Sequence, residues 1–349
     1  MASYLVTGGA GFIGSHLAEE LVRRNHRVRV ADNLVTGKRR NLDHLDDVEF
    51  LEGDLVDPAF AACAVSGMDY VLHQAAIPSV PRSVKDPITS NSANIDASLN
   101  VLCAARHAGV KRLVYAGSSS AYGDTPTLPK REDMPPHPRS PYALQKLVAE
   151  QYCQMFTRLY GFETVTTRYF NVFGPRQDPR SPYSGVISLF WTALLEGRRP
   201  VIHGDGEQTR DFTFVTNVVD GVLRACEAPN AAGEVMNVAC GTRISLNELV
   251  VVMNRLAGTN LQPIYKPERP GDVRDSQADI AKAGALLGYR PLVPLEEGLR
   301  RTLDWCRTES RRPAVSVCRS NCSPSASMNT TCDKSTMTIG DGAPSKIAR

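Results

Sequence analysis

Residues 4–14, with the sequence YLVTGGAGFIG, decide the fold of this 349-residue chain. The apolar residues 4–7 predict a short strand, and the glycines after them predict a tight turn into a helix. Ile13, Leu17 and Leu21 recur at helical spacing, so this helix should have one apolar face. Glycines let a backbone approach a pyrophosphate closely, and a helix N-terminus supplies amide donors for phosphate. The stretch therefore predicts a strand–turn–helix unit that binds a phosphorylated ligand.

The next strand provides the context that a glycine pattern by itself lacks. A lone glycine-rich turn is weak evidence, because any tight strand-to-helix connection can use glycine. Here residues 27–31 predict a second strand that ends at Asp32, where dinucleotide-binding folds place a carboxylate on the adenosine ribose. Such a carboxylate repels a 2′-phosphate, which favours NAD over NADP. Lys38, Arg39 and Arg40 follow closely, and their positive charges reduce this preference for NAD.

Strand-like and helical segments then alternate along the chain. Strands are predicted at 48–54, 69–76 and 113–116, and a helix at 94–108. This alternation predicts an α/β fold with a Rossmann-like, doubly wound parallel sheet, which binds ligands at the carboxyl ends of its strands. The polar or small residues at those predicted ends are Asp54, Gln74, Ala75, Ser118 and Asn171.

The alternation breaks after residue 173. The Pro-rich segment 174–182 predicts a loop, whereas 217–225 predicts a helix that returns to the sheet. We therefore expect an NAD-binding Rossmann domain at 1–173, with 212–240 returning to it. A smaller, interleaved α/β substrate-binding lobe would consist of 174–211 and 241–311. Residues 312–349 are rich in Ser and Thr and lack periodicity, so we expect a disordered tail there.

The composition is that of an ordinary globular protein, with 42% hydrophobic and 22% charged residues. A formal net charge of +3 is too small to indicate a nucleic-acid or membrane partner. No apolar run reaches membrane-spanning length, and the chain starts without a signal peptide, so we expect a cytoplasmic protein. The nine cysteines lack the paired spacing of a zinc site, so we expect no metal.

Residues 140–146, SPYALQK, predict the start of a helix, because Ser140 is a good N-cap and Pro141 suits the first helical position. Tyr142 and Lys146 then lie on one face of its first turns. A nearby ammonium is expected to lower the pKa of Tyr142 from its ordinary value of about 10, making the phenol a usable base. Most Tyr/Lys pairs at this spacing are structural, so the surrounding motifs must decide.

Ser118 turns this pair into a candidate catalytic set. Tyr142 would take a proton from a substrate hydroxyl while hydride leaves the same carbon for NAD. Ser118 would hydrogen-bond that oxygen, and Lys146 would hold the nicotinamide ribose and the phenolate. Residues 118–120 alone could be a polar loop. A dinucleotide fold before them and a Tyr/Lys pair after them favour catalysis.

Ten segments together carry a resemblance to a known family. They are 7–14 (TGGAGFIG), 32–33 (DN), 73–76 (HQAA), 79–83 (SVPRS), 118–123 (SSSAYG), 142–146 (YALQK), 168–171 (RYFN), 204–212 (GDGEQTRDF), 269–272 (RPGD) and 274–279 (RDSQAD). On these motifs the chain resembles the extended short-chain dehydrogenases/reductases, specifically the bacterial NAD-dependent UDP-hexose 4-epimerases. The resemblance spans residues 3 to about 307 and is closest to the subgroup acting on UDP-N-acetylglucosamine or its uronic acid.

The resemblance implies NAD as cofactor, a UDP-sugar as substrate and a homodimer formed by the helices near 94–108 and 142–160. The implied NAD contacts are Gly8, Gly11, Phe12, Ile13, Gly14, Asp32, Asn33, Gly37, Asp54, Leu55, Gln74, Ala75, Ala76, Tyr142, Lys146 and Tyr169. The implied substrate contacts are Ser83, Ser119, Ser120, Asn171, Val186, Gln208, Arg210, Arg269, Asp272 and Ser276. The arginines among them suit bidentate binding of a diphosphate.

The implied reaction inverts C4 of the sugar through a 4-keto intermediate, without net redox. Related dehydratases place Asp and Glu after the catalytic Ser/Thr, and UDP-glucuronate decarboxylases usually place Glu there. Ser119 and Ser120 are neither strong acids nor strong bases, which argues against both lyases. Ser276 matches the position beside the sugar's 2-substituent and leaves room for an N-acetyl group. We therefore expect activity on UDP-N-acetylglucosamine, UDP-glucose or both. UDP-glucuronate epimerisation, a lyase and a non-enzymatic NAD-binding protein are the alternatives.

Overall fold

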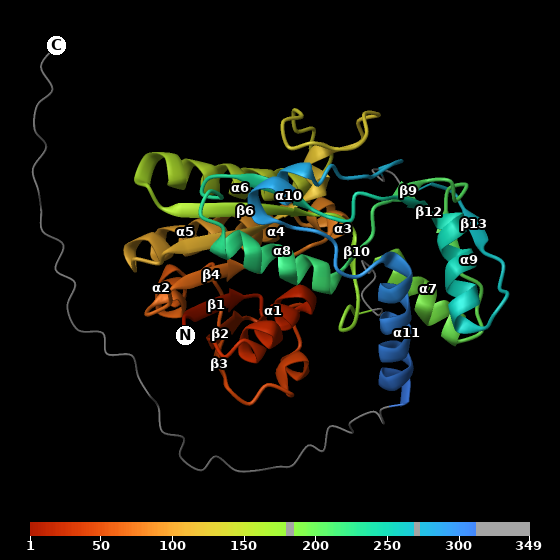
Figure 1. Ribbon diagram of the computed structural model, residues 1–349, viewed down its shortest axis with the longest axis horizontal. Coiled ribbons are helices and arrows are strands. Elements are labelled where there is room, and N and C mark those ends of the chain that lie inside the picture. The colour runs from red at the N-terminus through yellow and green to blue at the C-terminus, as the bar shows by residue number, and fades with distance from the viewer. Residues whose placement is uncertain (179–184, 269–272, 312–349) are drawn as a thin grey trace, which may run out of the picture. The chain divides into compact units, whose positions relative to one another are not determined.

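The glycine-rich stretch folds as predicted in a computed structural model, which describes residues 1–178, 185–268 and 273–311 (Figure 1). Strand β1 (Ser3–Thr7) leads through the turn into helix α1 (Phe12–Arg23). Gly8 has a φ of +64°, and a Cβ there would lie 2.8 Å from the Cα of Ala75. Both the conformation and the close approach of a neighbouring strand therefore require glycine. The tail expected at 312–349 lies outside the described residues.

Seven parallel strands form the central sheet in the order β11-β6-β5-β4-β1-β2-β3. Their bounds are β1 (Ser3–Thr7), β2 (Arg27–Asp32), β3 (Val48–Glu52), β4 (Tyr70–His73), β5 (Arg112–Ser118), β6 (Glu163–Tyr169) and β11 (Val235–Val238). Thr7 pairs with Ala31 and with His73, and Ser118 pairs with Tyr169, so the carboxyl ends of the strands meet at one edge. The predicted fold class, a Rossmann-like doubly wound parallel sheet, is confirmed.

Helices cover both faces of the sheet (Figure 1). Helix α8 (Val215–Glu227) packs beside α1, and this pair covers one face with a core that contains Leu17, Leu21, Val218 and Val222. Each of these side chains is at most 1% exposed, and burial of this kind contributes roughly 1.5–3 kcal/mol per side chain. The other face carries α2 (Pro58–Val65), α5 (Ala97–His107) and α6 (Pro141–Tyr160). The helix predicted at 217–225 is α8, and it does return to the sheet.

The helix expected at 94–108 begins differently from the prediction. Helices α3 (Val80–Lys85) and α4 (Pro87–Asn91) come first, and a π-helical turn (Ser92–Asp96) joins α4 to α5. The wide turn buries Asn94, whose Oδ1 accepts the N–H of Ile77 at 2.8 Å and whose Nδ2 donates to Gln145 at 2.9 Å. A π-turn of this kind often marks a functional site. Periodicity alone cannot reveal it, because the contacts of Asn94 are long-range.

A second group of elements lies beyond one end of the sheet (Figure 1). Its helices are α7 (Val186–Leu195), α9 (Leu246–Ala257) and α11 (Leu295–Arg311), with α10 (Ala281–Leu287) returning to the sheet. Short strands pair as β7 (Val172–Phe173) with β10 (Thr213–Phe214), β8 (Val201–His203) with β13 (Ile264–Lys266), and β9 (Thr209–Arg210) with β12 (Ile244–Ser245). Aromatic and aliphatic side chains, including Phe190, Trp191 and Leu249, form its core. The domain boundaries given above stay a prediction. Among the described residues, no helix is long and apolar enough to span a membrane.

Candidate active site

The start of α6 is fixed from two sides. As predicted, Pro141 is the first helical residue, and the Oγ of Ser140 accepts the N–H of Ala143 at 3.1 Å. Ser83 on α3 accepts the N–H of Tyr142 at 3.0 Å and has no exposed surface. Tyr142 and Lys146 then point from successive turns toward the same cavity, since both line it.

This cavity has a volume of about 1430 Å³ and lies at the carboxyl ends of the parallel strands. Sites for one small ligand usually measure roughly 300–1,000 Å³. At one end it is lined by the glycine turn, and at the other by residues of β9 and of the segment after residue 272. The predicted residues that line it are Gly8, Gly11, Phe12, Ile13, Gly14, Asp32, Asn33, Gly37, Asp54, Leu55, Gln74, Ala75, Ala76, Ser118, Ser119, Ser120, Tyr142, Lys146, Tyr169, Asn171, Arg210 and Ser276. Its size fits two ligands side by side.

The glycine end has the shape that a dinucleotide needs. A Cβ on Gly14 would lie 2.3 Å from the carbonyl oxygen of Gly8, and one on Gly11 would lie 3.0 Å from the same atom. Gly11 is the N-cap of α1 and makes no side-chain capping bond, so the first N–H groups of the helix lack a side-chain cap. These main-chain donors suit a pyrophosphate.

Polar side chains around this end also fit a dinucleotide. The carboxylate of Asp32 is held by the N–H groups of Ala10 (3.0 Å) and Leu34 (2.8 Å), and burial raises its pKa. Gln74 accepts the hydroxyl of Tyr169 at 3.0 Å, while its buried Nε2 has no partner among the described residues. A buried donor without a partner is costly, so a ligand acceptor would satisfy it. The residues present therefore fit NAD.

The electrostatics of the Tyr142/Lys146 pair differ from the prediction. Burial raises the pKa of Tyr142 above its ordinary value, and hydrogen bonding by Ser118 works in the opposite direction. Burial also lowers the pKa of Lys146 to about 8. The Lys146 ammonium lies 4.7 Å from the ring centre of Tyr115. The expectation that the pKa of Tyr142 lies below its ordinary value is wrong for this structure, because burial raises it.

The serines after β5 form a short 3-10 turn, η3 (Ser119–Tyr122), whose N-cap is Ser118. The Oγ atoms of Ser118 and Ser120 lie 2.8 Å apart, and the N–H of Ser120 donates to the Oγ of Ser118 at 3.2 Å. All three serines line the cavity next to Tyr142. Hydroxyls rather than carboxylates therefore face the space where a substrate would react.

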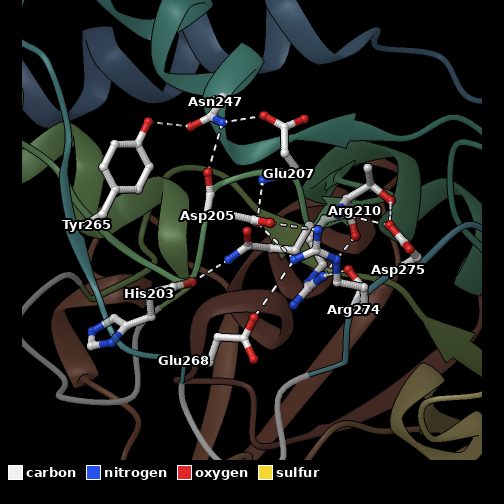
Figure 2. Close-up of polar contacts among 11 residues, drawn as sticks. His203, Asp205, Glu207, Arg210, Asn247, Tyr265, Glu268, Arg274 and Asp275 are labelled. Atoms are coloured by element: carbon white, nitrogen blue, oxygen red, sulfur yellow. Dashed lines mark hydrogen bonds and ion pairs between the residues drawn. The ribbon is translucent and has the colours of Figure 1, made fainter.

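The opposite wall carries three of the predicted substrate residues. Asn171 has a φ of +34° and donates through Nδ2 to the carbonyl of Asp211 at 3.1 Å. The guanidinium of Arg210 donates to the carbonyl of Thr209 at 2.8 Å. It also donates to the carbonyl of Arg274 at 3.0 Å (Figure 2). The N–H of Ser276 donates to the carbonyl of Thr209 at 3.1 Å. Strand β9 thus holds the segment after residue 272 against the cavity.

Five of the predicted substrate residues are not among the described residues that line the cavity. Ser83 lies behind Tyr142, and its hydroxyl donates to the carbonyl of Val80. The side-chain amide of Gln208 donates to the carbonyl of His203, away from the cavity lining. Val186 packs against the core of the second group of helices. Arg269 and Asp272 lie outside the described residues.

Sequence reasoning missed two groups near the site. Lys130 is 2% exposed and lines the cavity, and its Nζ donates to the hydroxyl of Thr125 at 2.6 Å. A single lysine in a proline-rich loop gives no sequence signal. The Nδ1 of His73 lies 2.7 Å from the Oγ1 of Thr7, and its Nε2 lies 3.0 Å from the Oγ of Ser98. Burial, aided by Lys146, lowers its pKa to about 3, so it stays neutral. The motif containing His73 was noted, but not this network.

The parallel sheet, the glycine turn and the Ser/Tyr/Lys set define a Rossmann-like enzyme of the short-chain dehydrogenase type, with a second binding region beside its cofactor end. A match to a protein family identifies this class more closely. The chain belongs to the NAD dependent epimerase/dehydratase family, whose model matches residues 4–239. NAD is accordingly its cofactor.

Known proteins resemble the chain over nearly all of its described length. A UDP-glucose 4-epimerase of Mycolicibacterium smegmatis is 39% identical over 312 residues, covering 88% of this chain and 99% of that protein. The structure of a UDP-N-acetylglucosamine 4-epimerase from Methanobrevibacter ruminantium M1, in complex with UDP-N-acetylmuramic acid, has a TM-score of 0.85 and 39% identity over 88% of this chain and 99% of that one. The structure of a UDP-glucose 4-epimerase from Thermus thermophilus with NAD has a TM-score of 0.80 and 37% identity over 87% and 99% of the two chains.

Proposed function

We propose that the protein is an isomerase that inverts C4 of a UDP-hexose, with NAD as cofactor. The observation that carries the proposal is that Ser118, Tyr142 and Lys146 line one continuous cavity, with the dinucleotide-shaped glycine turn at one end and Arg210 and Ser276 at the other. The named relatives that match over almost their full length are UDP-sugar 4-epimerases, which supports this reaction.

The roles of the residues follow from their positions. Bound NAD supplies the acceptor and donor of the hydride at C4. Tyr142 removes the proton from the 4-hydroxyl and later returns it, and Ser118 hydrogen-bonds the same oxygen. Lys146, one turn further along α6, would hold the nicotinamide ribose. Arg210 holds the diphosphate, so that the sugar can present either face to the cofactor.

The nature of Ser119 and Ser120 favours isomerisation over elimination. An elimination or decarboxylation needs an additional group that moves a proton, and a serine hydroxyl is a poor acid and base at neutral pH. Both serines line the cavity beside Tyr142, and hydrogen bonds to substrate hydroxyls are their chemically reasonable role. A 4-keto sugar formed here would therefore be reduced again rather than lose water or carbon dioxide.

The test is a direct assay of three substrates. Purified protein is incubated separately with UDP-N-acetylglucosamine, UDP-glucose and UDP-glucuronate, and the anomeric proton signals are followed by NMR. We expect the galacto-isomer from UDP-N-acetylglucosamine, UDP-glucose or both. Conversion of UDP-glucuronate alone would instead indicate the uronic-acid epimerase. Release of carbon dioxide or accumulation of a 4-keto sugar would contradict the proposal and favour a lyase.

Ser276 provides a prediction on substrate choice. Replacing Ser276 with Tyr should fill the space beside the 2-substituent and lower kcat/KM for UDP-N-acetylglucosamine about 10–200-fold more than for UDP-glucose, the range of pocket-size discrimination. Paired kinetics on the two substrates measure the ratio. Ser276→Ala is the matched control, and it should leave the ratio nearly unchanged. An equal loss on both substrates in the Tyr variant would remove Ser276 from this role.

We also propose that the protein forms a homodimer through α6 and the helices beside it. Large apolar side chains are exposed on α3 and α6, including Val84 (63%), Leu159 (60%) and Leu144 (51%). Apolar patches of this kind usually mark an interface. Leu159→Glu should convert the dimer to a monomer in light-scattering measurements, whereas Leu292→Glu, at another exposed leucine (57%), should not. A monomeric wild-type protein would exclude the dimer.

A further inference from the structure

Asp211 is a fully buried carboxylate between β9 and β10, with an exposed fraction of 0%. Its Oδ1 accepts the main-chain N–H of Cys240 at 3.0 Å. Its Oδ2 accepts the N–H groups of Gly241 at 2.9 Å and Ala278 at 3.1 Å. One side chain therefore joins its own loop to two segments that are distant in the sequence.

Two of the connected parts, the loop of Asp211 and the segment before Ala278, contribute to the wall of the cavity that faces the substrate. Arg210 directly precedes Asp211 in the chain, and Ser276 lies just before Ala278. Asn171 donates to the main-chain carbonyl of Asp211 at 3.1 Å. The three cavity residues therefore come from separate segments of the chain, and all three depend on the position of Asp211.

We propose that Asp211 is a positioning residue, which assembles Asn171, Arg210 and Ser276 into one binding surface for the UDP-sugar. This inference rests on the function proposed above. Asp211 does not line the cavity, so it acts through the residues that it holds. A carboxylate suits this position because it only accepts hydrogen bonds, and its two oxygens meet three N–H donors here. The side-chain NH2 of an asparagine would instead face main-chain N–H groups, and two donors cannot form a hydrogen bond.

Asp205 is a second carboxylate that bonds the segment after residue 272, but it lies at the surface. Figure 2 shows Arg274 between Asp205 and Glu268. The guanidinium of Arg274 meets both oxygens of Asp205, at 2.8 and 2.9 Å, but the side chains are 46% and 55% exposed. Water and salt weaken such a pair. Asp205 is therefore the matched control for Asp211, with the same residue type and a link to the same segment.

Thr209 and Asp275 provide another link between these segments. The hydroxyl of Thr209 donates to Asp275 at 2.5 Å, and the Asp275 side chain is 37% exposed. Neither this contact nor the main-chain bonds of Arg274 and Ser276 to β9 involve the Asp211 carboxylate, so the segment after residue 272 stays attached to β9 when Asp211 is replaced. The Asp211 carboxylate also bonds residues 240–241, and the side-chain amide of Gln277 donates to the carbonyl of Gly241 at 2.9 Å.

The ionisation of Asp211 gives the proposal a second readout. Burial raises the pKa of Asp211 to about 6, although its three N–H partners act in the opposite direction. The charged or titratable groups around it are Arg210 beside it, Cys240 after β11, and Tyr289, which Asp220 of α8 also influences. Burial raises the pKa values of Cys240 and Tyr289, so neither changes charge between pH 5 and 8.

The direction of the pH effect follows from the chemistry. Above pH 6 the ionised carboxylate accepts all three bonds. Below pH 6 it gains a proton, and a donor hydroxyl then faces the main-chain N–H groups. The binding surface should loosen as the pH falls through about 6, and the Kd for a UDP-sugar should rise. The diphosphate of UDP-sugars is a diester without a proton to gain in this range.

The experiment compares the wild type, Asp211→Asn and Asp205→Asn. Affinity for UDP-glucose is measured by calorimetry from pH 5 to 8, with KM and kcat for the converted UDP-sugar, bound NAD and Tm at pH 8. Asp211→Asn should raise the Kd for UDP-glucose and the KM about 10-fold or more, the effect of one lost charge-assisted hydrogen bond, with kcat and bound NAD nearly unchanged. Asp205→Asn should change either constant less than about 2-fold.

The pH series separates positioning from simple destabilisation. The wild-type Kd should rise below pH 6, and that of Asp211→Asn should stay flat. An unchanged Kd in Asp211→Asn, or a parallel fall of kcat, bound NAD and Tm, would overturn the proposal. If Asp211→Asn does not fold, a wild-type Kd that is constant from pH 5 to 8 would still overturn it. A wild type that binds UDP-glucose but converts no sugar would refute the reaction and leave this test intact.

Discussion

Replacing Tyr142 with Phe should lower kcat about 10²–10⁴-fold, the usual contribution of a positioned acid–base group. The variant loses one hydroxyl that lines the cavity next to Ser118, and this hydroxyl is the proposed base at C4. The phenyl ring keeps the packing, so bound NAD and the KM should stay close to their wild-type values. Steady-state kinetics with UDP-N-acetylglucosamine or UDP-glucose, together with the absorbance of bound cofactor, measure both quantities.

Tyr152 offers a matched control for Tyr142. It lies on the same helix, α6, but packs against the core between α6 and the sheet and does not line the cavity. The same change, Tyr152→Phe, should leave kcat within about 2-fold, since it alters no group at the site. Near wild-type turnover in Tyr142→Phe would remove Tyr142 from its role as base.

Replacing Arg168 with Met should lower the free energy of unfolding by about 3–5 kcal/mol, the typical loss when one partner of a buried ion pair is removed. Arg168 on β6 donates to both oxygens of Glu150 on α6, at 2.8 and 2.5 Å. The two side chains are only 5% and 4% exposed. The guanidinium also lies 4.6 Å from the ring centre of Tyr122. The variant would leave the Glu150 carboxylate buried without its partner.

Urea unfolding followed by circular dichroism measures this loss of unfolding free energy. Two further variants test whether the unpaired charge of Glu150 causes it. Arg255→Met breaks an exposed pair with Glu296 (63% and 49% exposed) and should cost less than about 1 kcal/mol. The double variant Arg168→Met/Glu150→Met removes both charges and should be more stable than Arg168→Met alone. A double variant that is less stable than either single variant would contradict the explanation by an unpaired charge.

The sequence predicted best what short segments determine. The turn at Gly8 requires a positive φ and a close approach to Ala75, and glycine meets both needs at any such turn. The N-cap at Ser140 is likewise a contact between neighbours in the chain. The position of Asp32 at the end of the second strand was predicted from the length of one strand–turn–helix unit. These features, and with them the fold class, could therefore be derived before any contact was known.

The features that were missed depend on contacts between distant segments. Asp211 was part of a quoted motif, yet its role depends on N–H groups at residues 240, 241 and 278. Lys130 lines the cavity only because its loop is bonded to residues 277–279. The pKa of Tyr142 was predicted from Lys146 alone, whereas burial by the surrounding fold raises it. Spacing along a chain contains no measure of burial.

The place of β11 in the sheet determines the order in which this protein can complete its fold during synthesis. Val235–Val238 pairs with Thr166–Tyr169 of β6, although the whole of α7, β8 and α8 lies between the two strands in the chain. Until residue 238 has left the ribosome, one edge of β6 has unpaired N–H and C=O groups, which can pair with another chain. A nascent or truncated protein that ends before β11 is therefore exposed to edge-to-edge association. The intervening lobe cannot be removed without moving the strand that closes this edge.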